Sequence, residues 1–218
     1  MIKSLLHFNN PNNLIKDEIT EVPWKVVGTV ASSQDGKFRN CLSMAGNGYL
    51  QNNTIDLSLD KEWTLDMWVY ANAFTSDKAF FSVRSAQGNT PRQGIFNEGN
   101  DLLIANKSNS WNTYSLGLPV DEWVHFALVN SSSLLYAFVN GIKKVEHDNT
   151  NVNLLNSPEV LIGRDRTGSN FIGLVDEFRI SDRALWVSNF TPPAKEYLLA
   201  KYIFIDKNNT VMGMKKEG

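Results

Sequence analysis

The sequence is poor in the residues that build disulfides, zinc sites and thiol nucleophiles. Its 218 residues include one cysteine, Cys41, and three histidines that are scattered along the chain. One cysteine excludes an intrachain disulfide and a cysteine-rich zinc site. A catalytic thiol needs a base beside it, which the spacing of the histidines does not supply. Cys41 is therefore predicted to be a small buried hydrophobic residue.

The chain also lacks a strong charge of either sign and long apolar runs. Its net charge is −2 and its pI is about 5.9, whereas nucleic-acid-binding proteins carry a concentrated basic face. No stretch approaches the ~18 apolar residues that a membrane span needs, and residues 1–6 have no apolar run typical of a signal peptide. We therefore expect no nucleic-acid partner, no membrane partner and no signal peptide.

Apolar residues are nevertheless abundant, and they follow the period of a β-strand. Hydrophobic residues make up 42% of the chain and aromatic residues 11%, which is enough for a large packed core. Residues 63–70, WTLDMWVY, show the clearest alternation, and the opposite face of this strand includes the aromatic Trp68. The residues predicted to point into the core are Trp63, Leu65, Met67 and Val69.

Turn signals every eight to twelve residues separate further short strands. The pair Asn140–Gly141 is the preferred type I′ turn of a hairpin, and residues 122–147 around it predict a three-stranded meander. Residues 102–105 and 111–116 predict another hairpin. Because no long helical period is present, the predicted fold class is all-β, a two-sheet antiparallel β-sandwich.

Residues 171–180 predict the closing strand, and residues 182–188 predict one helical turn after it. Strict alternation separates two faces of this strand. One face would carry Leu174, Asp176, Phe178 and Ile180, and the other would carry Gly173, Val175, Glu177 and Arg179. The sequence IGLVDEFRI over 172–180 resembles the closing strand of concanavalin A-like (laminin G-like, jelly-roll) domains, and DEWVHFA over 121–127 resembles another strand of that family.

The resemblance covers roughly residues 4–193 and implies a jelly-roll sandwich whose first and last strands lie side by side. We assign the laminin G-like sandwich to residues 1–197. Residues 198–218 predict an appended β-hairpin, which needs a packing partner because an isolated hairpin is unstable. The partners hypothesised for it are other virion or tail subunits, or further copies of the chain in a homo-trimer.

The segment that follows the closing strand resembles phage tail and prophage members of the family, through Ala184-Leu185-Trp186 and then Asn189 to Pro193. This resemblance implies a non-catalytic carbohydrate- or receptor-binding module of a phage tail or prophage surface protein. Its ligand would be a host-surface glycan or a cell-wall polysaccharide. The expected location is the virion, or the bacterial cytoplasm before release. The alternatives are a purely structural virion or assembly module and a glycoside hydrolase.

The hydrolase alternative requires two carboxyl groups that flank one glycosidic bond, about 5–9.5 Å apart. The glucanases of this fold carry them as Glu-x-Asp-x-x-Glu, which this sequence lacks. Asp176 and Glu177 are adjacent and alternate between faces, while Glu62 and Asp66 would lie roughly 13 Å apart along an extended strand. A catalytic pair of carboxyl groups could form only if loops brought distant acidic residues together. We therefore expect that the protein is not an enzyme.

Many laminin G-like domains hold Ca²⁺ between an early acidic loop and the Asp of the closing strand. By this resemblance Asp17 and Asp176 would be ligands, and backbone carbonyls would complete the six to eight oxygens that calcium prefers. The early loop of this chain departs from the usual glycine- and serine-rich pattern. In the alternative, Asp176 caps turn amides, and Glu177 pairs with Arg179 or a neighbouring strand.

Aromatic and amide side chains close together in sequence are the candidates for sugar binding. Trp111, Asn112 and Tyr114 offer a ring face that stacks on a sugar, together with an amide and a hydroxyl that can recognise its OH groups. Trp68 on the outer face of its strand is a further candidate. The alternatives are that Trp111 belongs to the core and that a loop or neighbouring strands cover Trp68.

Overall fold

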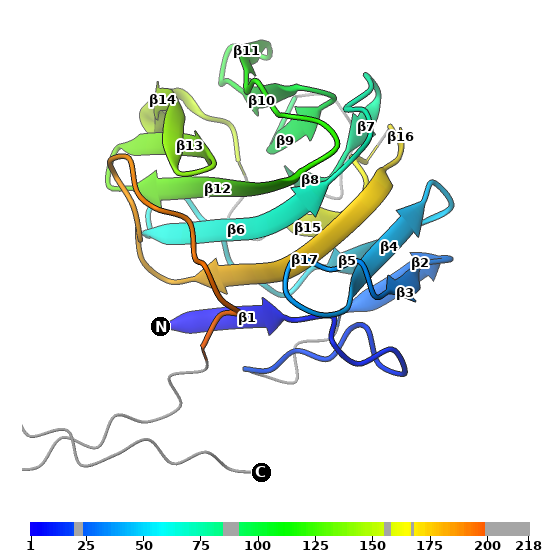
Figure 1. The fold of residues 1–218 in the computed structure, drawn as a ribbon. Helices are drawn as coiled ribbons and strands as arrows, with labels where there is room; N and C mark the ends of the chain where they lie inside the picture. Colours follow the sequence, from blue (N-terminus) through cyan, green and yellow to red (C-terminus); the bar gives the residue numbers. More distant parts are fainter. Residues whose placement is uncertain (20–23, 85–91, 155–157, 167, 199–218) are drawn as a thin grey trace, which may run out of the picture.

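Two large sheets packed face to face form the molecule (Figure 1). The computed structural model describes residues 1–19, 24–84, 92–154, 158–166 and 168–198. The predicted all-β sandwich is confirmed. Within the described ranges, no helix has the length and apolar character that crossing a bilayer requires.

One sheet has eight strands, in the order β14-β13-β12-β6-β17-β4-β3, with β1 also paired to β17. The strands are β1 (Ile2–Leu6), β3 (Ala31–Ser33), β4 (Cys41–Ala45), β6 (Trp63–Tyr70), β12 (Trp123–Ser131), β13 (Leu134–Val139), β14 (Ile142–Asp148) and β17 (Ile172–Ser181). The first and last strands lie side by side, as the family resemblance implied, with Leu5 opposite Arg179.

The other sheet has seven strands, in the order β11-β10-β9-β8-β15-β5-β2. These are β2 (Lys25–Gly28), β5 (Gly48–Asn52), β8 (Phe81–Arg84), β9 (Ile95–Glu98), β10 (Asp101–Ala105), β11 (Trp111–Ser115) and β15 (Glu159–Ile162). The short strands β7 (Lys78–Ala79) and β16 (Ser169–Asn170) form a separate parallel pair, and η1 (Asn149–Asn151) is one 3₁₀ turn.

The inner faces of the two sheets form one core, in which Phe81 of β8 meets Phe126 of β12 with ring centroids 4.9 Å apart. Burying one such side chain stabilises the fold by ~1.5–3 kcal/mol. The predicted inward set of β6 is confirmed, because all four of its members belong to this core: Trp63, Leu65, Met67 and Val69. Cys41 is fully buried, as predicted, and burial raises the pKa of its thiol to about 12.

The hairpin predicted over residues 102–116 and the meander predicted over 122–147 are also confirmed. Strands β10 and β11 pair across a short turn, and β12, β13 and β14 form the meander. Asn140 and Gly141 both have positive φ, 50° and 76°, as a type I′ turn requires.

The predicted alternation along β17 is wrong before Glu177. A bulge between Asp176 and Arg179 shifts the register against β6, and Glu177 has φ of 51°. Because a bulge inserts one extra residue, Val175 points into the core instead of sharing the outer side with Arg179, whereas Phe178 and Ile180 keep their predicted common face.

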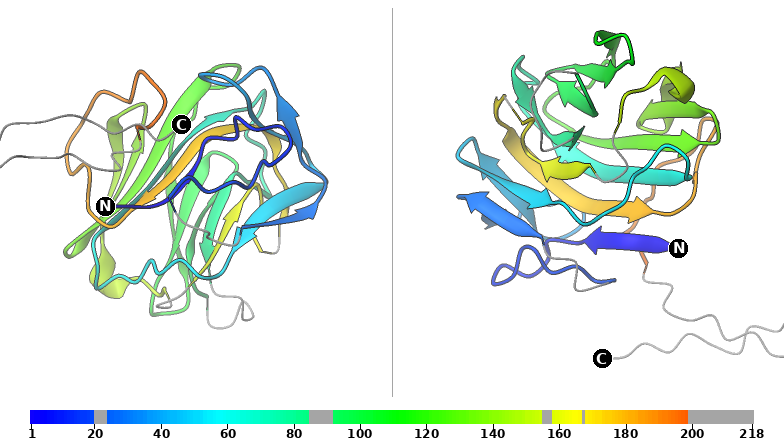
Figure 2. Two further views of the ribbon diagram at one scale, coloured as in Figure 1. Left: turned by 90° about the horizontal axis from the view of Figure 1, so that it is seen from below. Right: turned by 180° about the vertical axis from the view of Figure 1, so that it is seen from behind.

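The chain after β17 covers part of the outer face of the eight-stranded sheet. We call residues 182–198 the C-terminal segment; it is drawn in orange and passes beside β13 and β14 (Figure 2). The helical turn predicted for 182–188 is wrong, because this stretch is bent but not helical. Its Trp186 and Phe190 rings stack 3.9 Å apart and pack against Phe138 and its neighbours. Of the predicted hairpin, residues 199–218 lie outside the described residues.

Candidate functional site

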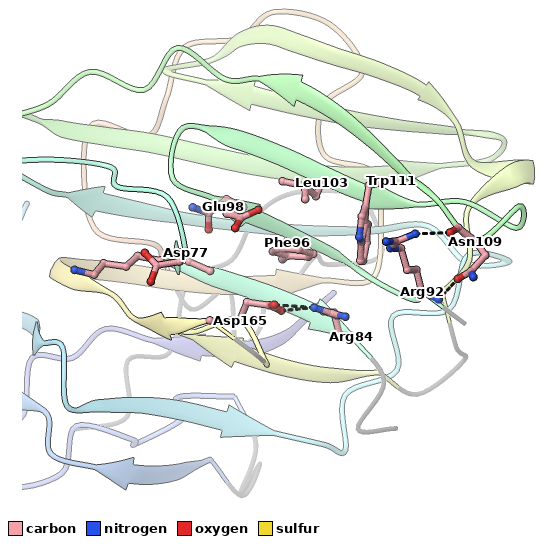
Figure 3. A pocket seen from close by; sticks show the side chains of 13 residues that line it. Asp77, Arg84, Arg92, Phe96, Glu98, Leu103, Asn109, Trp111 and Asp165 are labelled. Carbon is pink, nitrogen blue, oxygen red and sulfur yellow. Dashed lines mark hydrogen bonds and ion pairs between the residues drawn. The ribbon is translucent and has the colours of Figure 1, made fainter. Parts of the chain in front are cut away.

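A pocket of about 530 Å³ lies on the outer face of the seven-stranded sheet (Figure 3). Strand alternation produces this face: along β8, Phe81 and Val83 point into the core, so Arg84 points outward. Strands β9, β10 and β11 and the loops around β7 and β16 supply the other walls. Labelled in Figure 3 are Asp77, Arg84, Arg92, Phe96, Glu98, Leu103, Asn109, Trp111 and Asp165.

A buried ion pair forms the floor of the pocket. Arg84 Nη1 donates to both oxygens of Asp165, at 2.9 and 2.7 Å, and Ser82 Oγ donates to the same carboxylate at 3.1 Å. Both charged side chains are about 95% buried. Moving two charges out of water costs several kcal/mol per ion, which only good geometry and further hydrogen bonds offset. The pair therefore places fixed, oriented charges beneath the pocket.

Two aromatic rings stand over this floor. Phe96 and Trp111 meet edge to face, with centroids 5.1 Å apart. The Arg84 guanidinium lies 4.9 Å from the centroid of Phe96 and 5.2 Å from that of Trp111, which adds a cation–π attraction to both rings. Gly94 makes room for this arrangement, since a Cβ there would lie 2.1 Å from Arg84 Cγ. The half-buried Trp111 ring is thus held in place and lines an open pocket.

The two ends of the pocket carry opposite charges. Arg92 and Asn109 lie beyond Trp111 at one end, and Asp77 and Glu98 lie at the other (Figure 3), where they outnumber Lys78, the lining residue that follows Asp77. Asp77 accepts a hydrogen bond from Ser169 Oγ at 2.8 Å. The surface of the pocket therefore combines ring faces, hydrogen-bonding groups and a charge gradient, which is the chemistry that oligosaccharide-binding sites use.

Comparison with known proteins identifies the fold family. The family described as the concanavalin A-like lectin/glucanases superfamily matches residues 44–189. The chain belongs to this superfamily. A search of the curated proteins found no match.

Several solved structures share the fold. Domain 4 of AbnA, a GH43 extracellular arabinanase from Geobacillus stearothermophilus, in complex with arabinotriose, is similar with a TM-score of 0.70 and 20% identity, over 85% of this chain and 94% of that one. The binding domain of botulinum neurotoxin DC in complex with rat synaptotagmin II has a TM-score of 0.61 and 14% identity, over 85% of this chain. The binding domain of Paraclostridial mosquitocidal protein 1 has a TM-score of 0.61 and 16% identity. The chain spans about half the length of these two toxin domains (49% in each).

The structure does not bring the three neighbouring sugar-binding candidates together. Trp111 lines the pocket, but Asn112 and Tyr114 pair with Ile104 and Leu102, which face the core. Side chains directly opposite each other share a face, so both point away from Trp111. The Tyr114 hydroxyl instead forms a 2.8 Å hydrogen bond with His147 Nδ1.

Trp68 lies on the outer face of the eight-stranded sheet, as predicted, but it is covered. Lys37 Nζ sits 4.1 Å above its ring, and Phe38 and His125 contact it edge to face. The side chain is only 6% exposed. Trp68 therefore offers no open ring face to a sugar, in agreement with the alternative that a loop covers it.

The two predicted calcium ligands accept hydrogen bonds from different segments of this concanavalin A-like domain. Asp17 accepts hydrogen bonds from Ser4 Oγ and from the amides of Leu5 and Ile19, at 2.5, 3.2 and 2.9 Å. Asp176 accepts one from the Phe38 amide at 3.2 Å. These donors occupy carboxylate oxygens that would otherwise coordinate a cation. In the described part of the chain, no group of three or more His, Cys, Asp or Glu side chains is placed to hold a metal ion.

The residues therefore do not fit the predicted calcium site in this arrangement, and calcium binding stays a prediction. Asp176 acts as the alternative suggested, as an acceptor for backbone amides. Its burial, together with the neighbouring charge of Glu177, raises the pKa of its carboxyl to about 7. Glu177 pairs with His7 Nδ1 at 2.6 Å rather than with Arg179.

Sequence reasoning missed Arg84, Phe96 and Asp165, although one signal for Arg84 was present. Residues 81–84, FSVR, alternate on the strand period, which places an arginine opposite two core residues. No comparable signal identifies Asp165, because it is 81 residues from Arg84 and meets it only through the pairing of β8 with β15.

Proposed function

We propose that this protein is a non-catalytic carbohydrate-binding module and that the pocket on the seven-stranded sheet is its sugar site. The observation that carries the proposal is the pair of rings, Phe96 and Trp111, held over the Arg84–Asp165 ion pair. A ring face fixed in this way stacks on the apolar face of a sugar without losing side-chain freedom on binding.

The comparisons support a binding module in two ways. The AbnA domain, which has the higher TM-score, was solved with an oligosaccharide, and the neurotoxin domain was solved with a protein receptor. We favour carbohydrate because the pocket presents aromatic rings and polar groups. Asp165 is engaged by Arg84 and Ser82, so it is poorly placed to act as the proton donor that a glycoside hydrolase requires.

The biological setting that we propose is a phage tail or a prophage surface protein. The support is the sequence of the C-terminal segment, Ala184-Leu185-Trp186 followed by residues 189–193, which resembles such proteins. In this setting the ligand is a host-surface glycan or a cell-wall polysaccharide, and other tail subunits are the protein partners.

A glycan array followed by calorimetry on the best ligand tests the sugar site. Trp111→Ala is expected to weaken binding by about 5- to 150-fold, since stacking on one ring contributes on the order of 1–3 kcal/mol. Trp123→Ala is the matched control, because Trp123 is also half-buried but lies on the eight-stranded sheet, against Tyr70. Equal losses in both variants, or no signal on the array, would contradict the proposal and favour a purely structural module.

A further inference from the structure

Arg92 is an exposed arginine that is held at three points. Its amide donates to Asn109 Oδ1 at 2.7 Å, and its Nη1 donates to the Asn109 carbonyl at 2.6 Å. Its own carbonyl accepts a hydrogen bond from Asn153 Nδ2 at 2.7 Å. Asn109 adopts φ of 63° in the turn between β10 and β11, a conformation that asparagine tolerates better than most residues. Two separate loops therefore hold the Arg92 backbone, and the Asn109 carbonyl holds its guanidinium.

This arginine has no carboxylate partner within the described part of the chain, although it lines the pocket. Most surface arginines lose considerable side-chain entropy when they bind an anion. Arg92 has already lost part of that freedom through its bonds to Asn109. A guanidinium fixed in advance retains a planar edge of N–H donors that matches the two oxygens of a carboxylate.

The opposite end of the pocket repels the same kind of ligand group. Glu98 is exposed there, next to Asp77, and these two acids outnumber Lys78, which follows Asp77 in the chain and also lines the pocket. An anion in the pocket is therefore attracted to the Arg92 end and disfavoured at the Asp77 and Glu98 end. This asymmetry gives a bound sugar chain one preferred direction.

We propose that the pocket selects an acidic glycan and that Arg92 is the residue that recognises its carboxylate, beside a sugar ring stacked on Trp111. This inference rests on the proposed function, because it assigns the class of ligand to the same site. The ligand class is an oligosaccharide that contains a uronic or sialic acid, with the carboxylate located at the Arg92 end.

The test is an array that pairs uronate- and sialate-containing oligosaccharides with their carboxyl-reduced, neutral counterparts. The wild-type protein is expected to bind an acidic member at least tenfold more tightly than its neutral counterpart. Arg92→Gln is expected to abolish this preference, and Arg92→Lys to restore part of it, because lysine keeps the charge but not the planar fork. Arg183→Gln is the matched control, since it removes the same charge from the exposed C-terminal segment.

The outcomes separate this inference from the proposed function. Binding of neutral glycans that depends on Trp111 but not on Arg92 would overturn the acidic ligand while leaving the sugar site intact. Equal loss of preference in Arg183→Gln would show a general charge effect and would also overturn it. Absence of Trp111-dependent binding to any glycan would overturn both.

Discussion

Arg179 of β17 donates two hydrogen bonds of 2.9 Å, from Nε and Nη2, to the two carboxylate oxygens of Asp66 on β6. Asp66 is completely buried, and its Oδ2 also accepts a 2.5 Å hydrogen bond from Tyr197 and lies 3.3 Å from His125 Nε2. Burial acts to raise the pKa of Asp66, but the charge of Arg179 and the hydrogen bonds with His125 and Arg179 outweigh it, so the pKa is lowered. This network joins two central strands to the C-terminal segment.

Replacing Arg179 by methionine is expected to destabilise the fold by about 3–5 kcal/mol, because it leaves the Asp66 carboxylate buried without its cation. Urea unfolding monitored by tryptophan fluorescence measures the change. Lys143→Met is the control, since its ion pair with Glu146 is exposed and contributes at most ~1 kcal/mol. Similar midpoints for the two variants would show that the Arg179–Asp66 pair does not stabilise the fold.

Tyr197→Phe is expected to loosen the C-terminal segment before the sandwich unfolds. The variant loses the hydroxyl that contacts Asp66 and His125, at about 1–2 kcal/mol, while the bond from the Tyr197 amide to Glu177 is retained. Hydrogen exchange over residues 183–196 measures the local effect. Tyr114→Phe, whose hydroxyl contacts His147 at a distant edge, should leave this exchange unchanged; a uniform increase over the whole chain would contradict a local role.

The raised pKa of Asp176 is expected to make the stability of the fold depend on pH. Its pKa is about 7 in the folded protein and about 3.9 in an unfolded chain, so the folded state binds the proton more tightly. The free energy of unfolding therefore falls as pH rises from about 4 to about 7, by on the order of 3 kcal/mol. Asp176→Asn, which keeps an acceptor for the Phe38 amide, should gain stability relative to the wild type at pH 8 but not at pH 4. Parallel melting profiles at both pH values would contradict the raised pKa.

Gly141→Ala is expected to disturb the contact between the β13–β14 turn and the C-terminal segment. A Cβ at Gly141 would lie 1.9 Å from the Phe190 carbonyl oxygen. Gly117→Ala is a matched control, because Gly117 also has positive φ but its added Cβ would meet only Lys144 Nζ, 3.8 Å away. The control should cost ~1 kcal/mol for backbone conformation alone, and Gly141→Ala at least twice that. Equal melting temperatures would show that the segment moves aside freely.

The sequence specifies the sandwich well where alternation is strict and poorly where one strand breaks its own period. The inward residues of β6 and the turn at Asn140–Gly141 are predicted because they depend on neighbours in the chain. The bulge at Glu177 is not, since no glycine or proline marks it, and the contacts with His7 and the amide of Tyr197 that surround its side chain come from distant segments.

The candidate site is also predictable only in part, because some of its residues meet through contacts between distant segments. Trp111 is identified by its chemistry, but its supposed partners Asn112 and Tyr114 lie on the other face, which strand alternation alone would have indicated. The actual partners, Arg84 and Asp165, are brought together by sheet pairing. A single sequence does not reveal which strands become neighbours.

The C-terminal segment makes the two sides of the sandwich unequal. It seals part of the eight-stranded sheet, whereas the pocket opens from the seven-stranded sheet. If several copies are tethered through the sealed side, their pockets face outward together. Binding of one pocket to a repetitive polymer then raises the effective concentration of the polymer at the other pockets, so several weak contacts give a high overall avidity.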